Sequence, residues 1–301
     1  MTAPELTLDE AELRRLAESA LAEDRADRDV TTAALVPLDQ TGRGIIIAKA
    51  EGVLAGIPIA RAVFAAVDTA LVWKPSLEDG HRLSPGDRVV SIEGSLSSIL
   101  RAERVALNYL THLSGVATAT AAVVRAVEGT GCSLRDTRKT IPGLRVLEKY
   151  AVRLGGGTNH RLNLAEGVLI KDNHLAALLN RDLGIGDAVR LTRLGNPDTR
   201  IEIEVTTVDE ARQALGAAAD ELLLDNMPLD QMREVVALAA ASRSDPDEPA
   251  SSGRRPLLEA SGGITLENAR AVAQTGVDFI SMGAITHSAE ALDMSLEIEA
   301  N

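Results

Sequence analysis

The sequence is poor in cysteine and in aromatic residues. Cys132 is the single cysteine among 301 residues, so no internal disulfide can form, as is typical of proteins in the reducing cytoplasm. Aromatic residues make up 2% of the chain, and acids outnumber bases to give a net charge of −13. Nucleic-acid binding uses basic surfaces and stacking rings, so this composition argues against a nucleic-acid partner.

Long hydrophobic runs are also missing. No apolar run reaches the ~18 residues that a membrane-spanning helix needs, and the acidic start MTAPELTLDEAELRR lacks the basic and apolar parts of a signal peptide. We therefore expect no membrane partner and a cytoplasmic location. The 45% content of hydrophobic residues indicates an ordinary folded protein with one large or two smaller domains.

The charge is unevenly spread along the chain. Residues 135–174 contain eight basic and four acidic residues, a net charge of +4, and the rest of the chain carries −17. A basic stretch in an acidic protein favours a small polyanionic ligand. The alternative is a solvated helix face whose charge has no function.

Hydrophobic patterning divides the chain into two halves. The first half predicts an α+β arrangement, with helices at 8–22, 57–67 and 97–128 and strands within 42–56 and 81–95. In the second half short apolar strands alternate with helices. The seven expected strands lie within 132–139, 152–161, 167–174, 201–205, 221–226, 257–264 and 278–286, and helices are expected at 206–215, 228–241 and 265–276.

This alternation predicts a parallel α/β sheet. Polar residues follow most of the strands, as they do at the carboxyl edge of (β/α) barrels. Seven strands make an incomplete barrel unless an eighth escapes the pattern, and an open doubly wound sheet fits the same periodicity. The Ser/Pro-rich residues 242–256 are expected to form an exposed, flexible insertion without a catalytic role.

Three successive strand ends carry Arg138, Lys139, His160, Arg161 and Lys171. If these side chains converge, they suit a ligand with several carboxylates or phosphates, because Arg grips a carboxylate through two hydrogen bonds and Lys acts as a point charge. Surface ion pairs with neighbouring acids are the alternative.

Acids and glycines end the later strands. Glu204 and Asp225 fit three roles: holding Mg²⁺, stabilising a developing positive charge, or neutralising the basic stretch. Glu202 has the same strand parity as Glu204, so alternation does not separate the two. Residues 261–263 (Ser-Gly-Gly) and Gly283 suit phosphate binding through backbone N–H groups, with tight turns as the alternative.

Several motifs occur in a recognisable order. They are ERVALNYLTHLSGVAT (103–118), DTRKTIPGLR (136–145), GGGTNHR (155–161), LIKDNH (169–174), IEIEV (201–205), LLLDNM (222–227), EASGGI (259–264) and ISMGAITHSA (280–289). In this set the chain resembles the quinolinate phosphoribosyltransferase family, over about residues 20–298.

The resemblance implies transfer of a phosphoribosyl group from 5-phosphoribosyl 1-diphosphate to quinolinate with decarboxylation. The products would be nicotinate mononucleotide, diphosphate and CO2 in de novo NAD biosynthesis, with Mg²⁺ accompanying the diphosphate. The implied fold is an N-terminal α+β sandwich over 1–116, to which 288–301 returns, followed by an incomplete, about seven-stranded α/β barrel over 117–287. Homodimers or larger homo-oligomers with shared active sites are implied as well.

The resemblance also assigns site residues in this numbering. Quinolinate would be held by Arg138, His160, Arg161, Lys171 and, from a neighbouring subunit, Arg104. The phosphoribosyl substrate would be held by Lys139, Glu204, Asp225, Ser261, Gly263, Gly283 and His287, with the two acids nearest the metal, directly or through water. The catalytic residues would be Lys139, Lys171, Glu204 and Asp225.

Three other functions stay open at this point. A sister phosphoribosyltransferase could use nicotinate or another anionic ring, although a monocarboxylate needs fewer cations. A phosphosugar aldolase or isomerase could use Lys171 as a Schiff-base lysine. A non-catalytic sensor of phosphate ligands could retain the glycine loops, but it would have no use for the acid pair.

Overall fold

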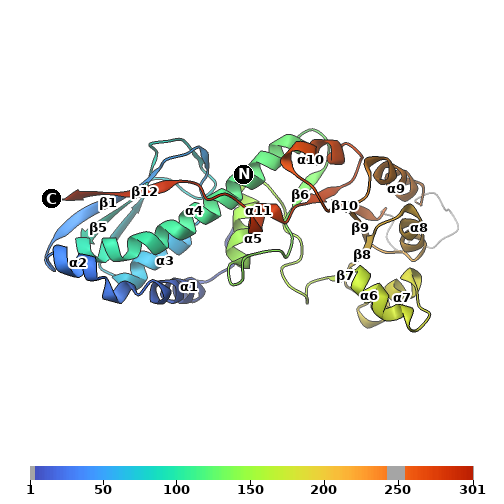
Figure 1. Cartoon of the computed structure of the whole chain (residues 1–301), viewed down its shortest axis with the longest axis horizontal. Helices are drawn as coiled ribbons and strands as arrows, with labels where there is room; N and C mark the ends of the chain where they lie inside the picture. Colours follow the sequence, from blue (N-terminus) through green and yellow to red (C-terminus); the bar gives the residue numbers. More distant parts are fainter. Residues whose placement is uncertain (1–3, 243–254, 301) are drawn as a thin grey trace. The chain divides into compact units, whose positions relative to one another are not determined.

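The computed structural model describes residues 4–242 and 255–300, which divide into two compact units (Figure 1). The first unit contains Met1–Ala121, Thr140–Gly156 and Ala284–Asn301, and the second contains Ala122–Lys139 and Gly157–Gly283. Residues 243–254 of the predicted insertion lie outside the described residues.

An antiparallel sheet with the strand order β12–β1–β5–β3 is the framework of the first unit. The last strand of the chain pairs with β1 along its length, from Gly42 opposite Ala300 to Ala48 opposite Met294. The strands of this unit are β1 (Thr41–Ala48), β3 (Val72–Pro75), β5 (Arg88–Ser95) and β12 (Met294–Ala300), with a separate pair β2 (Gly52–Val53) and β4 (Arg82–Leu83).

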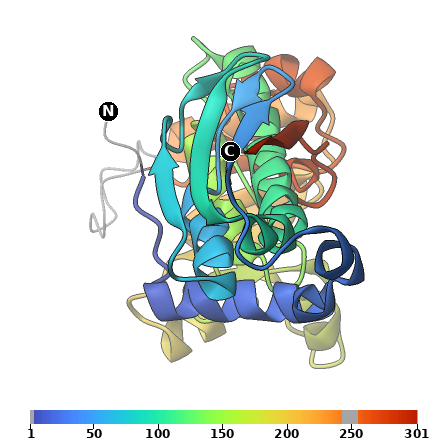
Figure 2. The same cartoon turned by 90° about the vertical axis from the view of Figure 1, so that its left-hand side faces the viewer.

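The strands of this sheet face the viewer in Figure 2, and the long helix α4 lies against the sheet from behind. A Cβ on Gly44 of β1 would come within 2.9 Å of Ile99 in α4, which shows how closely the two elements approach. The helices of the unit are α1 (Glu10–Glu23), the 3-10 turn η1 (Ala26–Arg28), α2 (Val30–Leu35), α3 (Ile57–Val67), α4 (Leu96–Val127, up to Ala121), α5 (Arg145–Leu154) and α11 (Ala284–His287).

Helix α4 has the length and hydropathy of a membrane-spanning helix. In this structure it is a core helix instead, because Ile99, Leu107, Leu110 and Leu113 are fully buried along one stripe. The helical spacing of these residues is the pattern from which the sequence predicted this element.

The second unit is built on a parallel sheet with the strand order β6–β11–β10–β9–β8–β7. Helices follow the strands and cover one face of the sheet (Figure 1). Its strands are β6 (Ser133–Arg135), β7 (Val168–Ile170), β8 (Ile201–Val205), β9 (Glu221–Asp225), β10 (Leu257–Ser261) and β11 (Phe279–Ser281). Its helices are α6 (Asp172–Leu179), α7 (Ile185–Gly195), α8 (Val208–Gly216), α9 (Leu229–Ala241) and α10 (Leu266–Ala273).

The predicted fold class, an α+β region followed by an incomplete α/β barrel, is confirmed, but one expected strand was wrong. Residues 152–161 form no strand in the described sheet. Val152–Leu154 is instead the last turn of α5, and only Thr158 makes an isolated parallel bridge, with Arg135. The stretch RVLEKYAVRL has the apolar spacing of an amphipathic helix, which begins before the segment that the strand prediction considered.

Alternation along the strands separates a helix-facing side from an acidic side. On β8, Ile201, Ile203 and Val205 are fully buried, whereas Glu202 and Glu204 point to the opposite face. The helices cover the apolar side, so the acids lie on the inner side of the sheet, where a barrel carries its chemistry.

Gly155 should be required for the close approach of two helices. A Cβ at this position would lie 2.4 Å from the carbonyl oxygen of Ala117 and 2.6 Å from Thr120 in α4. Replacing Gly155 with Ala should therefore lower the free energy of unfolding by about 1–3 kcal/mol, measured by chemical denaturation.

The matched control is Gly186→Ala, since Gly186 lies in α7 with open space around the position of its missing Cβ. That variant should be neutral or more stable by up to about 1 kcal/mol. Equal stability of Gly155→Ala and the wild type would contradict the close approach of α5 and α4.

Candidate functional site

The carboxyl ends of the parallel strands gather the predicted site residues of the second unit. Glu204 and Asp225 lie at the ends of β8 and β9, and Ser261 of β10 is the register partner of Asp225. The remaining predicted residues at this edge are Arg138 and Lys139 after β6, His160 and Arg161 before β7, Lys171 after β7, Gly263 after β10 and Gly283 after β11.

Two predicted site residues belong to the first unit. Arg104 lies on α4 and His287 ends α11, and both are exposed. The role of Arg104 toward quinolinate and that of His287 toward a phosphate stay predictions.

Arg161 of the second unit feels the positive charge of another guanidinium group. Burial and the positive charge of Arg138 together lower the pKa of Arg161. Arg161 stays in place because its Nη1 donates a hydrogen bond of 2.6 Å to the carbonyl oxygen of Gly167. A bound anion would stabilise both charges, so the pair is suited to a carboxylate or a phosphate.

The segment that carries these cations is tied to β6 by a buried acid. Asp136 is fully buried, and its carboxylate accepts hydrogen bonds from Asn159 Nδ2 at 2.7 Å and from the backbone N–H of His160 at 2.8 Å. The backbone of Thr158 also pairs with Leu134 and Asp136. Sequence reasoning counted Asp136 only as one acid of the basic stretch; its burial is the signal that it holds the loop.

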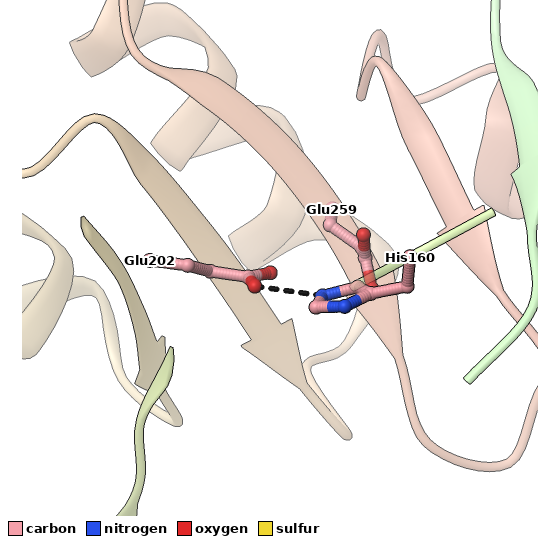
Figure 3. Close-up of side chains that lie close together, drawn as sticks. All are labelled: His160, Glu202 and Glu259. Carbon is pink, nitrogen blue, oxygen red and sulfur yellow. Dashed lines mark hydrogen bonds and ion pairs between the residues drawn. The ribbon is translucent and has the colours of Figure 1, made fainter. Parts of the chain in front are cut away.

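A layer of buried charged side chains lies beneath the strand ends. His160 Nε2 and Glu202 Oε2 are 2.8 Å apart, and Glu259 lies beside them (Figure 3). Arg135 donates hydrogen bonds to Glu221 and, at 2.7 Å, to Glu259 Oε2. Neither Glu259 nor Glu221 was predicted as a functional residue from the sequence, although each is an acid at an inner-face position of a buried strand.

One set of atoms in this layer has the spacing of a metal site. Ligand atoms of His160, Glu202 and Glu259 lie within 4.8 Å of one another. His160 Nε2 is hydrogen-bonded to Glu202, however, and Glu259 is ion-paired with Arg135. These contacts use His160 Nε2 and one carboxylate oxygen of each acid, whereas Glu202 Oε1 and Glu259 Oε1 are buried without a hydrogen-bond partner in the described part of the chain.

Glu204 and Asp225 form an acid pair nearer the surface. Burial raises the pKa of Glu204, and the negative charge of Asp225 raises it further, whereas Lys171 acts in the opposite direction. Asp225 accepts a hydrogen bond of 2.8 Å from Asn226 Nδ2. Both carboxylates are half-buried, so water can reach them, as Mg²⁺ sites with retained water ligands require.

The loop after β10 is a tight turn that needs glycine. Gly262 and Gly263 adopt positive φ angles of 86° and 59°, which favour glycine. A Cβ on Gly262 would lie 2.3 Å from Oδ1 of Asn226, so this position also needs the small side chain. Without side chains at these positions a phosphate can approach the backbone closely, so the predicted phosphate role stays compatible with the loop.

Lys139 and Lys171 present exposed side chains at the same edge. The backbone N–H of Lys171 donates to His174 Nδ1 at 2.9 Å, at the start of α6. The backbone N–H of Lys139 donates to Thr137 Oγ1 at 3.0 Å. Each ammonium group is thus on an ordered segment and accessible to a ligand.

Comparison with known proteins accounts for both halves of the chain. The quinolinate phosphoribosyl transferase N-terminal domain matches residues 29–114, and the C-terminal domain matches residues 116–297. The chain belongs to the quinolinate phosphoribosyltransferase family. The resemblance inferred from the sequence motifs is thereby confirmed.

Individual relatives agree with this membership. A nicotinate-nucleotide pyrophosphorylase (carboxylating) of Mycobacterium leprae is 41% identical over 284 residues, which cover 93% of this chain and 94% of the relative. A quinolinate phosphoribosyltransferase (decarboxylating) of Nicotiana tabacum is 36% identical over 295 residues, covering 96% and 83%.

Solved structures show the same fold. The nicotinate-nucleotide pyrophosphorylase from Francisella tularensis is 35% identical, covers 99% of this chain and 100% of its own, and has a TM-score of 0.87. A human nicotinic acid phosphoribosyltransferase is 17% identical with a TM-score of 0.60 and shares the fold alone.

Gly262 should matter for the phosphoribosyl substrate more than for quinolinate. Gly262→Ala places a Cβ against Asn226, so the loop must shift. The positive φ angle adds a conformational cost of roughly 1–2 kcal/mol for alanine. We expect the KM for 5-phosphoribosyl 1-diphosphate to rise about tenfold, which is the effect of a cost of that size. The KM for quinolinate should change little.

Steady-state kinetics with each substrate varied in turn measures the two constants. Gly216→Ala is the control, because Gly216 ends α8 in open space. An equal rise of both KM values would argue against a phosphate cradle at this loop.

Proposed function

We propose that this chain transfers the phosphoribosyl group of 5-phosphoribosyl 1-diphosphate to quinolinate. The reaction releases diphosphate and CO2 and forms nicotinate mononucleotide, a step of de novo NAD biosynthesis. The observation that carries this proposal is the meeting of two arginines, an acid pair and a glycine loop at one sheet edge in a member of this family.

Quinolinate is a dicarboxylate, and the cations divide between its two charged groups. Arg138 and Arg161 form the guanidinium pair whose charges an anion would stabilise. Lys171 supplies an exposed ammonium from the neighbouring strand end. A monocarboxylate such as nicotinate would leave part of this positive charge unpaired, so the set favours the dicarboxylate.

The first chemical step joins the pyridine nitrogen to the anomeric carbon of the ribose while the bond from that carbon to the diphosphate oxygen breaks. Positive charge develops on the ribose in the transition state. The carboxylates of Glu204 and Asp225 would stabilise this charge from fixed positions. Lys139 would offset negative charge on the departing diphosphate.

The second step breaks the bond between the ring and the carboxylate next to the nitrogen. The electron pair stays on the ring carbon, where the positively charged pyridinium stabilises it, and a proton then takes the place of CO2. The protein must hold this carboxylate without stabilising its charge too strongly, because over-stabilisation of the ground state slows the step.

We infer that Mg²⁺ binds with the diphosphate. Glu204 and Asp225 fit this ion, because both offer oxygen ligands and both are accessible to water. When bound, Mg²⁺ offsets the negative charge of the leaving diphosphate. Direct ligation and ligation through water are both compatible with this donor set.

The remaining inferences concern the setting of the enzyme. We infer a homodimer or larger homo-oligomer in which Arg104 of one subunit completes the quinolinate site of another. We further infer that the 5-phosphate of the phosphoribosyl substrate is held by Ser261, Gly263, Gly283 and His287.

We also infer a cytoplasmic location. The buried single cysteine agrees with it, since burial raises the pKa of Cys132 to about 12 and keeps the thiol unreactive.

A coupled assay tests the proposed function. The chain is incubated with quinolinate and 5-phosphoribosyl 1-diphosphate, and nicotinate mononucleotide and CO2 are both measured. We expect both products in equal amounts with Mg²⁺, and loss of both with a chelator. Turnover of nicotinate at the same efficiency, or a borohydride-trapped Lys171 adduct, would favour one of the other functions.

Arg138→Ala and Lys171→Ala should each raise the KM for quinolinate. Each variant removes a charged hydrogen-bond donor worth about 1.5–3 kcal/mol, which corresponds to roughly tenfold or more. Arg190→Ala is the control, because Arg190 is an exposed arginine of α7 paired with Asp187. Wild-type kinetics in either test variant would contradict the placement of that residue.

Activity should fall as the pH is lowered through the raised pKa of Glu204. Its ionised form is the one that stabilises the ribosyl charge, and this form is present above the pKa and lost below it. The measurement is the pH dependence of kcat/KM for the phosphoribosyl substrate, and Glu204→Gln should be slow and lack the acidic limb.

A further inference from the structure

The layer of buried charged side chains beneath the strand ends has its own role in this site, distinct from that of the residues at the strand ends. Glu202 lies two residues before Glu204 on β8, on the same face, and Glu259 lies two residues before Ser261 on β10. Both side chains are almost fully buried, with exposed fractions of 7% and 1%. Substrate that binds at the strand ends therefore lies above this layer.

Both ring nitrogens of His160 are hydrogen-bonded within the protein. Its Nδ1 accepts a hydrogen bond of 2.8 Å from the backbone N–H of Arg161, so this nitrogen carries no proton. Its Nε2 lies 2.8 Å from Glu202 Oε2, an acceptor, so Nε2 carries the proton and donates it. These two contacts together fit the neutral imidazole with the proton on Nε2. Burial disfavours the charged ring, whereas the hydrogen bond and the charge of Glu202 raise the pKa of His160 overall.

Arg161 is consequently held at two points. Its backbone N–H is fixed by His160, and its guanidinium is fixed by the carbonyl of Gly167 at 2.6 Å. The backbone from which the Arg161 side chain extends is therefore tied to the position of the His160 ring. That ring is in turn hydrogen-bonded to Glu202, which lies beside it (Figure 3).

We propose that Glu202 is a positioning residue of the quinolinate site, which acts by fixing the tautomer and orientation of His160 and through it the place of Arg161. The proposal rests on the proposed function. It moves His160 from direct contact with a substrate carboxylate to a supporting position. Glu202 itself touches no substrate.

The charges around Glu202 agree with this role. Arg135 is the cation of the layer and is bound by Glu221 and Glu259. Burial and the charge of Glu202 raise the pKa of Glu259 to about 7, which limits the negative charge of the layer near neutrality.

Two substitutions separate positioning from a merely structural role. Glu202→Gln keeps an oxygen that can accept a hydrogen bond from His160 Nε2. Glu202→Ala removes this acceptor. Glu221→Ala is the matched control, because Glu221 is a buried acid of the same layer that contacts Arg135 and not His160. All three variants are compared in the full-length chain, with their melting temperatures recorded.

Kinetics supplies the first readout. We expect Glu202→Ala to raise the KM for quinolinate by at least about tenfold, because displaced binding groups lose affinity steeply. The KM for 5-phosphoribosyl 1-diphosphate should stay within about twofold. Glu202→Gln should restore most of the loss, and Glu221→Ala should shift stability without this selective effect.

Nitrogen NMR of histidine-labelled protein supplies a readout that is independent of turnover. The His160 signal, assigned with His160→Gln, should show an unprotonated Nδ1 and a protonated Nε2 in the wild type and in Glu202→Gln, and should change in Glu202→Ala. A protonated Nδ1 in the wild type, stoichiometric metal held by His160, or equal kinetic effects of Glu202→Ala and Glu221→Ala would overturn the proposal. A wild type that makes no product from quinolinate while showing this tautomer would refute the proposed function alone.

Discussion

The buried carboxylate of Asp136 is the contact on which the basic side of the site depends. Asp136 follows β6, directly before the segment of Arg138 and Lys139, and it binds the segment of His160 and Arg161 through two hydrogen bonds. One fully buried acid therefore joins the segment of Arg138 and Lys139 to the segment of Arg161, and these segments carry most of the positive charge at the strand ends. Burying a carboxylate is costly unless hydrogen bonds compensate it, and here the compensation orders a binding loop.

Charge is arranged in layers on the inner side of the sheet. The deepest layer pairs Arg135 with acids and places its guanidinium 3.4 Å from the centre of the Phe279 ring. The layer at the strand ends carries Glu204 and Asp225. Strand parity produces both layers, since residues two apart share a face. The net charge of −13 therefore conceals a basic edge that can receive two anionic substrates.

Long segments with a regular hydrophobic pattern could be predicted from the sequence. How deeply each polar side chain is buried could not. Helix α4 was predicted almost to the residue, because its buried stripe repeats over many turns. Residues 152–161 were misassigned because three glycines resembled a strand end, whereas Gly155 is a point of close helix approach. Glu202 and Glu204 have identical parity, so only the structure shows that the first is buried against His160 and the second is half-buried. Contacts such as those of Asp136 join residues far apart along the chain, which a linear pattern does not encode.

The basic edge should select a dicarboxylate over a monocarboxylate, and direct binding tests this selection without turnover. Isothermal titration of the wild-type chain compares quinolinate with nicotinate, which lacks one carboxylate. Quinolinate should bind at least about tenfold more tightly, because a second charge-assisted contact is worth about 1.5–3 kcal/mol. Equal affinities for the two acids would contradict the assignment of Arg138, Arg161 and Lys171 to two carboxylates.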